Sequence, residues 1–199
     1  MTFFARLVAA ALLVTAACGG KLDSGNDAGS DGSPPPPLDA QPPPWDGGPP
    51  PLLDGGQCNN VPIVGPTVTL NEVATDAPPF PSGGSPLFQG VYGLVAFTAY
   101  SGPGGSSASL GTAQISMQVN PAKDGFDLQM IAVINSEPPQ TASSIATIIG
   151  PNQLNLSNYC PQASSGGAAS YYFDGSTLWL RAADSGSFVV DEQYSLMTN

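Results

Sequence analysis

Three groups of residues in this sequence have side chains of the kinds that carry out hydrolysis. They are the serine-rich stretch Gly102-Pro-Gly-Gly-Ser-Ser-Ala-Ser-Leu-Gly111 and the acid pairs Asp124/Asp127 and Asp191/Glu192. A serine nucleophile needs a base to accept its proton, and histidine, the most frequent base, is absent from the chain. The stretch also lacks the Gly-x-Ser-x-Gly pattern of a nucleophile elbow. We therefore interpret it as a long hairpin loop.

The two acid pairs are the residue types that glycosidases use. Asp191 and Glu192 are adjacent, and neighbouring residues of a strand point to opposite faces, so they do not form a carboxylate pair. Asp124 precedes Gly125 in a turn-forming dipeptide, which explains its presence locally. We expect no enzymatic activity, no cofactor and no metal site.

The charge of the chain excludes two classes of partner. Lys and Arg total 4 against 15 acids, which gives a net charge of −11. A nucleic-acid binder needs clustered basic side chains to displace counterions, and attraction to anionic lipid needs them too. We expect neither kind of electrostatic binding.

The first 18 residues, MTFFARLVAAALLVTAAC, predict an export signal. One arginine precedes an apolar run that is too short to span a bilayer, and small residues lead to Cys18. This arrangement resembles the lipobox of bacterial lipoproteins, with Thr15 where an aliphatic residue is usual. The resemblance implies that Cys18 is lipidated and holds the protein to a membrane, and Gly19, in place of Asp, implies the outer membrane or cell surface. The alternative is an ordinary secretory signal.

Residues 19–57 predict a disordered tether. The segment is dominated by Gly, Pro, Asp and Ser, as in SPPPPLDAQPPPWDGGPPPLLDGG, and it shows no apolar periodicity. Such a chain cannot bury enough surface to offset the entropy of ordering. We expect it to separate the membrane from a domain spanning residues 58–199.

The composition of residues 58–199 is typical of an all-β domain. Alternating, β-branched and aromatic runs lie between turns rich in Gly, Pro, Asn and Ser. Asp174-Gly175 predicts a tight hairpin. The expected strands are residues 91–100, 112–119, 126–134, 143–149, 153–157, 170–173, 177–181 and 188–196, with a further edge strand at residues 68–70.

Short consecutive strands joined by turns favour a single antiparallel meander of eight strands, closed into a barrel that leaves no exposed edge. The alternative is a β-sandwich. We expect the rest of residues 59–88 to lie across the barrel as irregular chain.

Two segments resemble lipocalin-like, calycin-type barrels. Gly90-Val91-Tyr92 is similar to the Gly-x-Trp start of the first lipocalin strand, and Asp174-Gly-Ser-Thr-Leu-Trp-Leu-Arg181 is similar to a closing hairpin of such domains. The resemblance implies a barrel over residues 88–196. It also implies that Arg181 packs across Tyr92.

Two cysteines besides Cys18 remain, Cys58 and Cys160. In an exported protein two remaining cysteines usually pair, which predicts a disulfide. The alternatives are two free thiols or a metal site.

The sequence leaves two functions open. The first is an envelope-anchored lipoprotein that displays a non-enzymatic domain with a role in surface structure or interaction, with an envelope protein or a glycan as partner. The second is a lipocalin-like barrel that holds a small apolar ligand. Residues of the ligand wall, or of a solid core, would be Tyr92, Leu94, Phe97, Met117, Phe126, Met130, Tyr171, Phe173 and Trp179.

Overall fold

A computed structural model describes residues 58–161, 164–183 and 188–197 of the 199-residue chain. The expected signal peptide with Cys18 and the expected tether therefore lie outside the described residues. Within the described ranges the chain forms strands and connecting segments and no helix, so the prediction of an all-β domain is confirmed. In this part of the chain there is accordingly no helix of the length and apolarity needed to cross a membrane.

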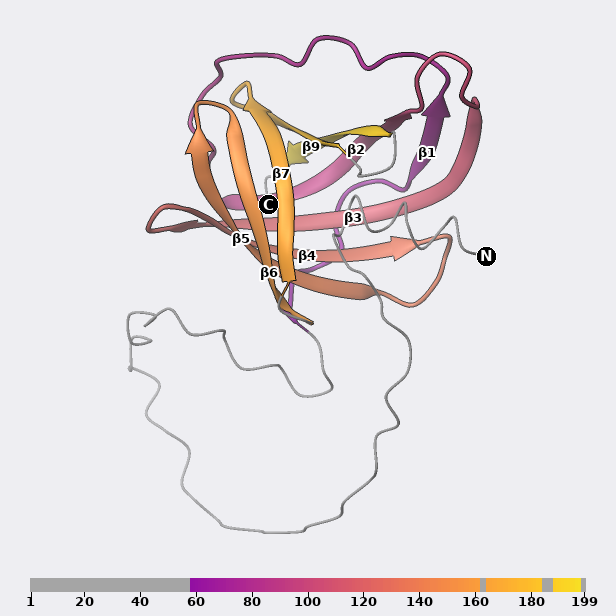
Figure 1. Ribbon diagram of the computed structural model, residues 1–199. Helices are drawn as coiled ribbons and strands as arrows, with labels where there is room; N and C mark the ends of the chain where they lie inside the picture. Colours follow the sequence, from indigo (N-terminus) through magenta and orange to yellow (C-terminus); the bar gives the residue numbers. More distant parts are fainter. Residues whose placement is uncertain (1–57, 162–163, 184–187, 198–199) are drawn as a thin grey trace, which may run out of the picture.

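Nine strands form one sheet (Figure 1). Their bounds are β1 Val68–Val73, β2 Gly90–Tyr100, β3 Ala108–Ala122, β4 Gly125–Ile134, β5 Gln140–Gly150, β6 Gln153–Cys160, β7 Ser164–Phe173, β8 Thr177–Ala183 and β9 Val189–Leu196. Each of the eight expected strands overlaps one of β2 to β9. The largest shift of a single boundary is at β7, which begins at Ser164 where we expected residue 170. Its first half is rich in Ser, Gly and Ala, and backbone pairing with β6 makes it a strand despite its weak propensity.

The sheet closes in a ring. Strands β2 to β9 each pair antiparallel with the next, and β9 pairs antiparallel with β2, with Tyr92 opposite Leu196 and Tyr100 opposite Val189. There is one continuous sheet among the described residues, so the two sheets of a sandwich are not formed.

The extra strand β1 differs from its expected position at an edge. It pairs parallel with β2, where Glu72 lies opposite Ala99, and antiparallel with β3, where Val68 lies opposite Ala113. Strands β2 and β3 pair directly only where Gly90–Gly93 meet Ser116–Val119. Strand β1 therefore fills the gap where β2 and β3 separate and satisfies backbone groups on both sides.

Alternation of side chains decides which residues enter the interior of the ring. Strand β9 shows it clearly, because Val190, Glu192 and Tyr194 are buried and the residues between them are only half-buried. The Asp174-Gly175 hairpin is confirmed between β7 and β8: Gly175 has a φ of 103°, and the Asp174 carboxylate accepts hydrogen bonds from two following backbone N–H groups. These bonds hold the pKa of Asp174 below its ordinary value.

The irregular segments run over the ring in two places. Residues 74–89 form the long trace at the top of Figure 1 and return to the ring at its β5–β6 and β7–β8 turns. Ser85 donates its backbone N–H to the Phe173 carbonyl at 2.7 Å, and Asn152 binds the backbone of Gly83. Residues 58–67 cross the outside of the sheet and form the first candidate site.

Candidate functional site

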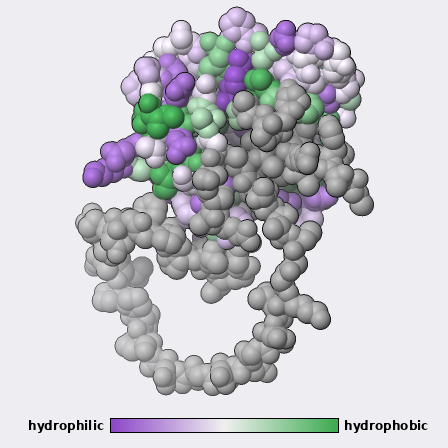
Figure 2. Space-filling model, in the orientation of Figure 1, coloured by the Kyte–Doolittle hydropathy of each residue, from purple (hydrophilic) through white to green (hydrophobic). Residues whose placement is uncertain are grey.

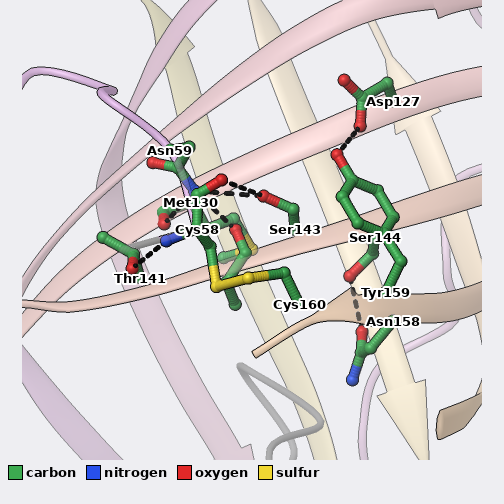
Figure 3. Close-up of a disulfide and its surroundings, with 11 residues drawn as sticks. Cys58, Asn59, Asp127, Met130, Thr141, Ser143, Ser144, Asn158, Tyr159 and Cys160 are labelled. Carbon is green, nitrogen blue, oxygen red and sulfur yellow. Dashed lines mark hydrogen bonds between the residues drawn. A yellow bond between two sulfur atoms is a disulfide. The ribbon is translucent and has the colours of Figure 1, made fainter. Parts of the chain in front are cut away.

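The chain enters the described fold through a group of residues that we call the clasp: Cys58, Asn59, Thr141, Ser143 and Cys160 (Figure 3). Cys58 and Cys160 form a disulfide across a Cα–Cα distance of 5.5 Å, and 102 positions separate them in the sequence. The disulfide prediction is therefore confirmed, and the free-thiol and metal alternatives are wrong. The bond ties the first described residue to the end of β6.

Asn59 holds the other side of the clasp. Its amide nitrogen Nδ2 donates to the carbonyl oxygens of Met130, at 3.1 Å, and Ala142, at 2.8 Å, and also to Ser143 Oγ at 3.2 Å. Its Oδ1 accepts from the backbone N–H of Val61. Only 4% of Asn59 is exposed, and both ends of its amide are used. Sequence reasoning missed Asn59, since the only local signal is its place after Cys58.

Beyond the clasp the segment stays on the outer face of the sheet. Ser116 Oγ exchanges hydrogen bonds with both backbone groups of Val64, and Gln114 donates to the Gly65 carbonyl. The backbone comes so close that a Cβ at Gly93 would lie 3.0 Å from the Gly65 Cα and would contact Met197 Cε. A larger residue at position 93 would require the Met197 side chain and the Gly65 backbone to move.

Polar side chains around the clasp have partners as well. Tyr159 donates its hydroxyl to Asp127 at 2.7 Å (Figure 3). Gln129 donates to the same carboxylate. Burial, and then the bond to Asp127, raise the pKa of Tyr159. Asp127 is thus an outward-facing structural acceptor, whereas Asp124 is exposed in the β3–β4 turn.

The serine-rich stretch is a hairpin loop between β2 and β3, as expected, although β3 begins earlier, at Ala108. Serine hydroxyls of the loop and of Ser101 before it are engaged within the loop, with β1 or with the residue that follows β1. Ser106 donates to Glu72, Ser101 donates to the carbonyls of Val73 and Ser106, and Ser107 accepts from Ala74. None of these bonds activates an oxygen as a nucleophile.

Most of the residues proposed for a ligand wall or core do lie on the inner face of the ring. Those that are fully or almost fully buried are Tyr92, Leu94, Phe97, Met117 and Phe173. Those that are partly buried and pack against this core are Phe126, Met130 and Tyr171. Tyr92 packs edge-on against Phe173 with ring centroids 6.2 Å apart, and its hydroxyl donates to the Phe88 carbonyl. Burial raises the pKa of Tyr92.

The prediction that Trp179 lies in the interior of the ring is wrong. It lies opposite Tyr172, and the two rings contact each other at a centroid distance of 5.2 Å. Its neighbours Leu178 and Leu180 are the β8 residues that belong to the core. Since side chains alternate along a strand, Trp179 faces outward.

The expected contact of Arg181 with Tyr92 is also wrong. Arg181 faces outward beside Asp191, to which it donates from Nε at 2.5 Å and from Nη2 at 2.6 Å. Its guanidinium carbon lies 4.8 Å from the centre of the Phe80 ring, and Nη1 donates to the Pro78 carbonyl. The sheet register places Asp191 at the level of Thr98, while Tyr92 lies further along β2 on the inner face.

Asp191 and Glu192 point to opposite faces, as the alternation predicted, but Glu192 has a feature that the sequence analysis missed. It is 6% exposed on the inner face, its Oε2 accepts from the Tyr194 hydroxyl at 2.9 Å, and its Oε1 is buried with no hydrogen-bond partner. Burial raises the pKa of Glu192 to about 7, and burial and the neighbouring carboxyl raise the pKa of Tyr194 far above its ordinary value. The spacing of Val190, Glu192 and Tyr194 was the available signal.

Comparison with protein-family models, with curated proteins and with solved structures finds no match to this chain. Within the described ranges no three His, Cys, Asp or Glu side chains lie close enough together to hold a metal ion. Two features can therefore be considered for a function: the clasp with its disulfide on the outside of the ring, and the unpaired Glu192 oxygen inside it.

Proposed function

We propose that this chain is an envelope-anchored lipoprotein that displays a non-enzymatic β-domain, with a role in surface structure or interaction. In this proposal Cys18 carries the lipid, residues 19–57 form the tether, and the ring of strands is held away from the bacterial outer membrane. The observation that supports it best is the position of the disulfide. Cys58 directly follows the expected tether, and its bond to Cys160 carries any pull on the tether into β6.

The anchor is tested by following the lipid and the location of the protein. Cells expressing the full chain are grown with radiolabelled palmitate, and the envelope is separated from soluble material. We expect label on the wild-type protein in the membrane fraction, and none on a Cys18→Ser variant. The matched control is Cys58→Ser with Cys160→Ser, which should keep the label. A wild-type protein that retains Met1 and stays in the cytosol would refute the proposal.

An interaction role is supported by apolar side chains left on the surface. Ile148 and Ile149, at the end of β5, are 44% and 56% exposed, and Phe88 is 51% exposed. Figure 2 shows apolar areas separated by polar ones on the visible face. A photo-crosslinking residue at position 149, with position 69 on the exposed side of β1 as control, tests whether an envelope component contacts this turn in intact cells. Equal labelling at both positions would argue against it.

The second candidate is a lipocalin-like, eight-stranded barrel that holds a small, mostly apolar ligand. The pairing of β2 with β9 and the inward aromatic residues support it, and so does the unpaired Glu192 oxygen. Native mass spectrometry of the full chain tests it directly. We expect an added mass of a few hundred daltons at most that is lost on unfolding. A clean apo mass together with no response to added ligands would leave the first candidate alone.

A further inference from the structure

Glu192 is a carboxylate placed among apolar side chains of the ring interior. Across the sheet it lies opposite Phe97 of β2 and opposite Leu180 of β8, and both belong to or pack against the core. Val190 and Tyr194, two positions before and after it, are buried on the same face. The side chain of Glu192 therefore points into the ring.

One of its two oxygens is satisfied and the other is not. Oε2 accepts from Tyr194, the nearest donor along the strand, while Oε1 has no partner. A buried carboxylate without compensating hydrogen bonds is among the costliest groups that a protein interior can contain. The unpaired oxygen lowers the stability of the fold, which makes it a candidate for contact with a ligand.

No basic side chain of the described residues neutralises Glu192. Arg181 faces outward and is paired with Asp191, and Lys123 is exposed in the β3–β4 turn. A second acid, Glu72, is 5% exposed at the end of β1 and is engaged by the Ser106 hydroxyl of the β2–β3 loop. A ligand that suits this interior carries positive charge and hydrogen-bond donors.

The wall that faces Glu192 has small side chains. In the ring order, β5 is four strands from β9 in either direction, so the two strands lie across from each other. The inner positions of β5 are Ala142, Ser144 and Ala146, which pair with Met130, Leu128 and Phe126 of β4. Alanine and serine are short side chains, so this wall reaches less far toward the Glu192 carboxylate than a wall of large side chains would, and the Ser144 hydroxyl is engaged with Asn158.

We propose that Glu192 and Tyr194 form an interior site for the ammonium group of a small organic amine, with the apolar part of the amine lying beside Phe97 and Leu180. This inference rests on the second candidate function and names its ligand class. The ammonium donates an N–H to Oε1 and neutralises the carboxylate, while Tyr194 keeps Oε2. A primary or secondary amine fits, because a quaternary ammonium has no N–H to donate. Aromatic neighbours favour a cation in the same place.

The protonation of Glu192 agrees with this chemistry. Burial raises its pKa to about 7, so the empty site holds a neutral carboxyl for part of the time near neutral pH. A bound ammonium favours the ionised form and lowers that pKa. A charge-assisted hydrogen bond in a buried site adds selectivity of at least about tenfold over an uncharged analogue of the same size.

The test compares three ligands of equal length on the full chain: hexylammonium, hexanol and hexanoate. Binding is measured by calorimetric titration and by the shift in Tm. We expect hexylammonium to bind at least about tenfold more tightly than hexanol, and hexanoate not to bind. Glu192→Gln keeps the shape of the side chain and should reduce the amine to the affinity of hexanol. Glu137→Gln, at an exposed acid of the β4–β5 turn, is the control and should bind like wild type.

Each outcome decides a different point. If hexanol binds as tightly as hexylammonium, or if Glu192→Gln keeps the preference, the interior binds apolar ligands and the amine site is refuted. If no ligand binds to wild type, the amine site is refuted, whereas the second candidate function is decided separately by native mass spectrometry of the full chain. The ligand comparison within wild type remains informative even if the variant folds poorly.

Discussion

The clasp and the interior around Glu192 differ in whether their buried polar groups have hydrogen-bond partners. In the clasp, the Asn59 amide has acceptors for its nitrogen and a donor for its oxygen, and Thr141 accepts from the Cys58 N–H. At Glu192, one carboxylate oxygen has a partner and the other has none. Both sites lie on the same ring of strands, one outside and one inside.

This difference suggests a structural role for the clasp and a binding role for the interior site. A fully paired polar group makes one arrangement of the chain more stable than its alternatives, and this is the expected property of an attachment point. An unpaired buried group lowers stability, so its presence points to a role that needs the free hydrogen-bonding capacity. Stability measurements can therefore test the comparison, because changes in the clasp should destabilise the protein and removal of the interior charge should not.

The largest expected effect is that of removing the disulfide. Cys58→Ser with Cys160→Ser should lower the free energy of unfolding by about 2–5 kcal/mol, because the bond closes a long loop in the unfolded chain. Urea unfolding followed by circular dichroism measures it. Cys18→Ser, which leaves the bond intact, is the control. An unchanged midpoint in the double variant would mean that the disulfide does not stabilise the fold and that the hydrogen bonds of the clasp suffice.

The next effect is a dependence of stability on pH through Glu192. Its pKa is raised from 4.5 to about 7 in the folded protein, so the folded state keeps a proton that the unfolded chain releases. The resulting stabilisation is complete below the unfolded pKa of 4.5 and is lost as the pH rises through 7. The loss is about 3 kcal/mol for complete titration, and Glu192→Gln should remove it because its amide does not titrate.

Urea unfolding at about pH 5 and about pH 8.5 measures this difference in wild type and in the variant. Tyr194 stays protonated over this range, since burial raises its pKa far above the ordinary value. Glu137→Gln serves as the matched control and should follow wild type. If wild type and Glu192→Gln lose equal stability between the two pH values, Glu192 does not hold an unpaired charge in the interior.

The alternation of apolar and polar residues made most of the strands of the ring predictable. The long-range contacts of the two sites were not predictable from it. Apolar residues alternate with polar ones in Ile115-Ser-Met117-Gln-Val119, which lies in β3, and Asp174-Gly175 forms the turn between β7 and β8; both signals are local in the sequence. The first half of β7 was missed because its small residues have no pattern of their own.

Asn59 shows why the sites were harder to predict than the strands. Its acceptor at Ala142 is 83 positions away, so no local pattern contains the interaction. The disulfide was predictable only from compartment and the number of cysteines. Trp179 was assigned to the interior on its apolar character alone, whereas the alternation with Leu178 and Leu180 decides its face. The same alternation, applied to Val190 and Tyr194, would have placed Glu192 inside.

Asn59→Ala should have an intermediate effect and separates the hydrogen bonds of the clasp from its disulfide. The variant leaves the carbonyls of Met130 and Ala142 without this donor, and we expect a loss of about 1–3 kcal/mol in the free energy of unfolding. The neighbouring Asn60 is exposed, so Asn60→Ala should change the free energy of unfolding by less than about 0.5 kcal/mol. Equal effects of the two variants would show that the disulfide alone makes the clasp.

The smallest effect is expected from the outward-facing pair of Arg181 and Asp191. Its coupling energy shows how much a paired polar group away from the clasp contributes to the stability of the fold. The two side chains are 16% and 14% exposed and share two hydrogen bonds, so solvent partly screens their attraction. In a double-mutant cycle of Arg181→Met and Asp191→Asn we expect a coupling energy of about 1 kcal/mol or less, which falls at high salt. Methionine retains an apolar stem beside Phe80, so the cycle isolates the charge. A coupling as large as the effect of removing the disulfide would mean that this pair, and not the clasp, is the main polar support of the ring.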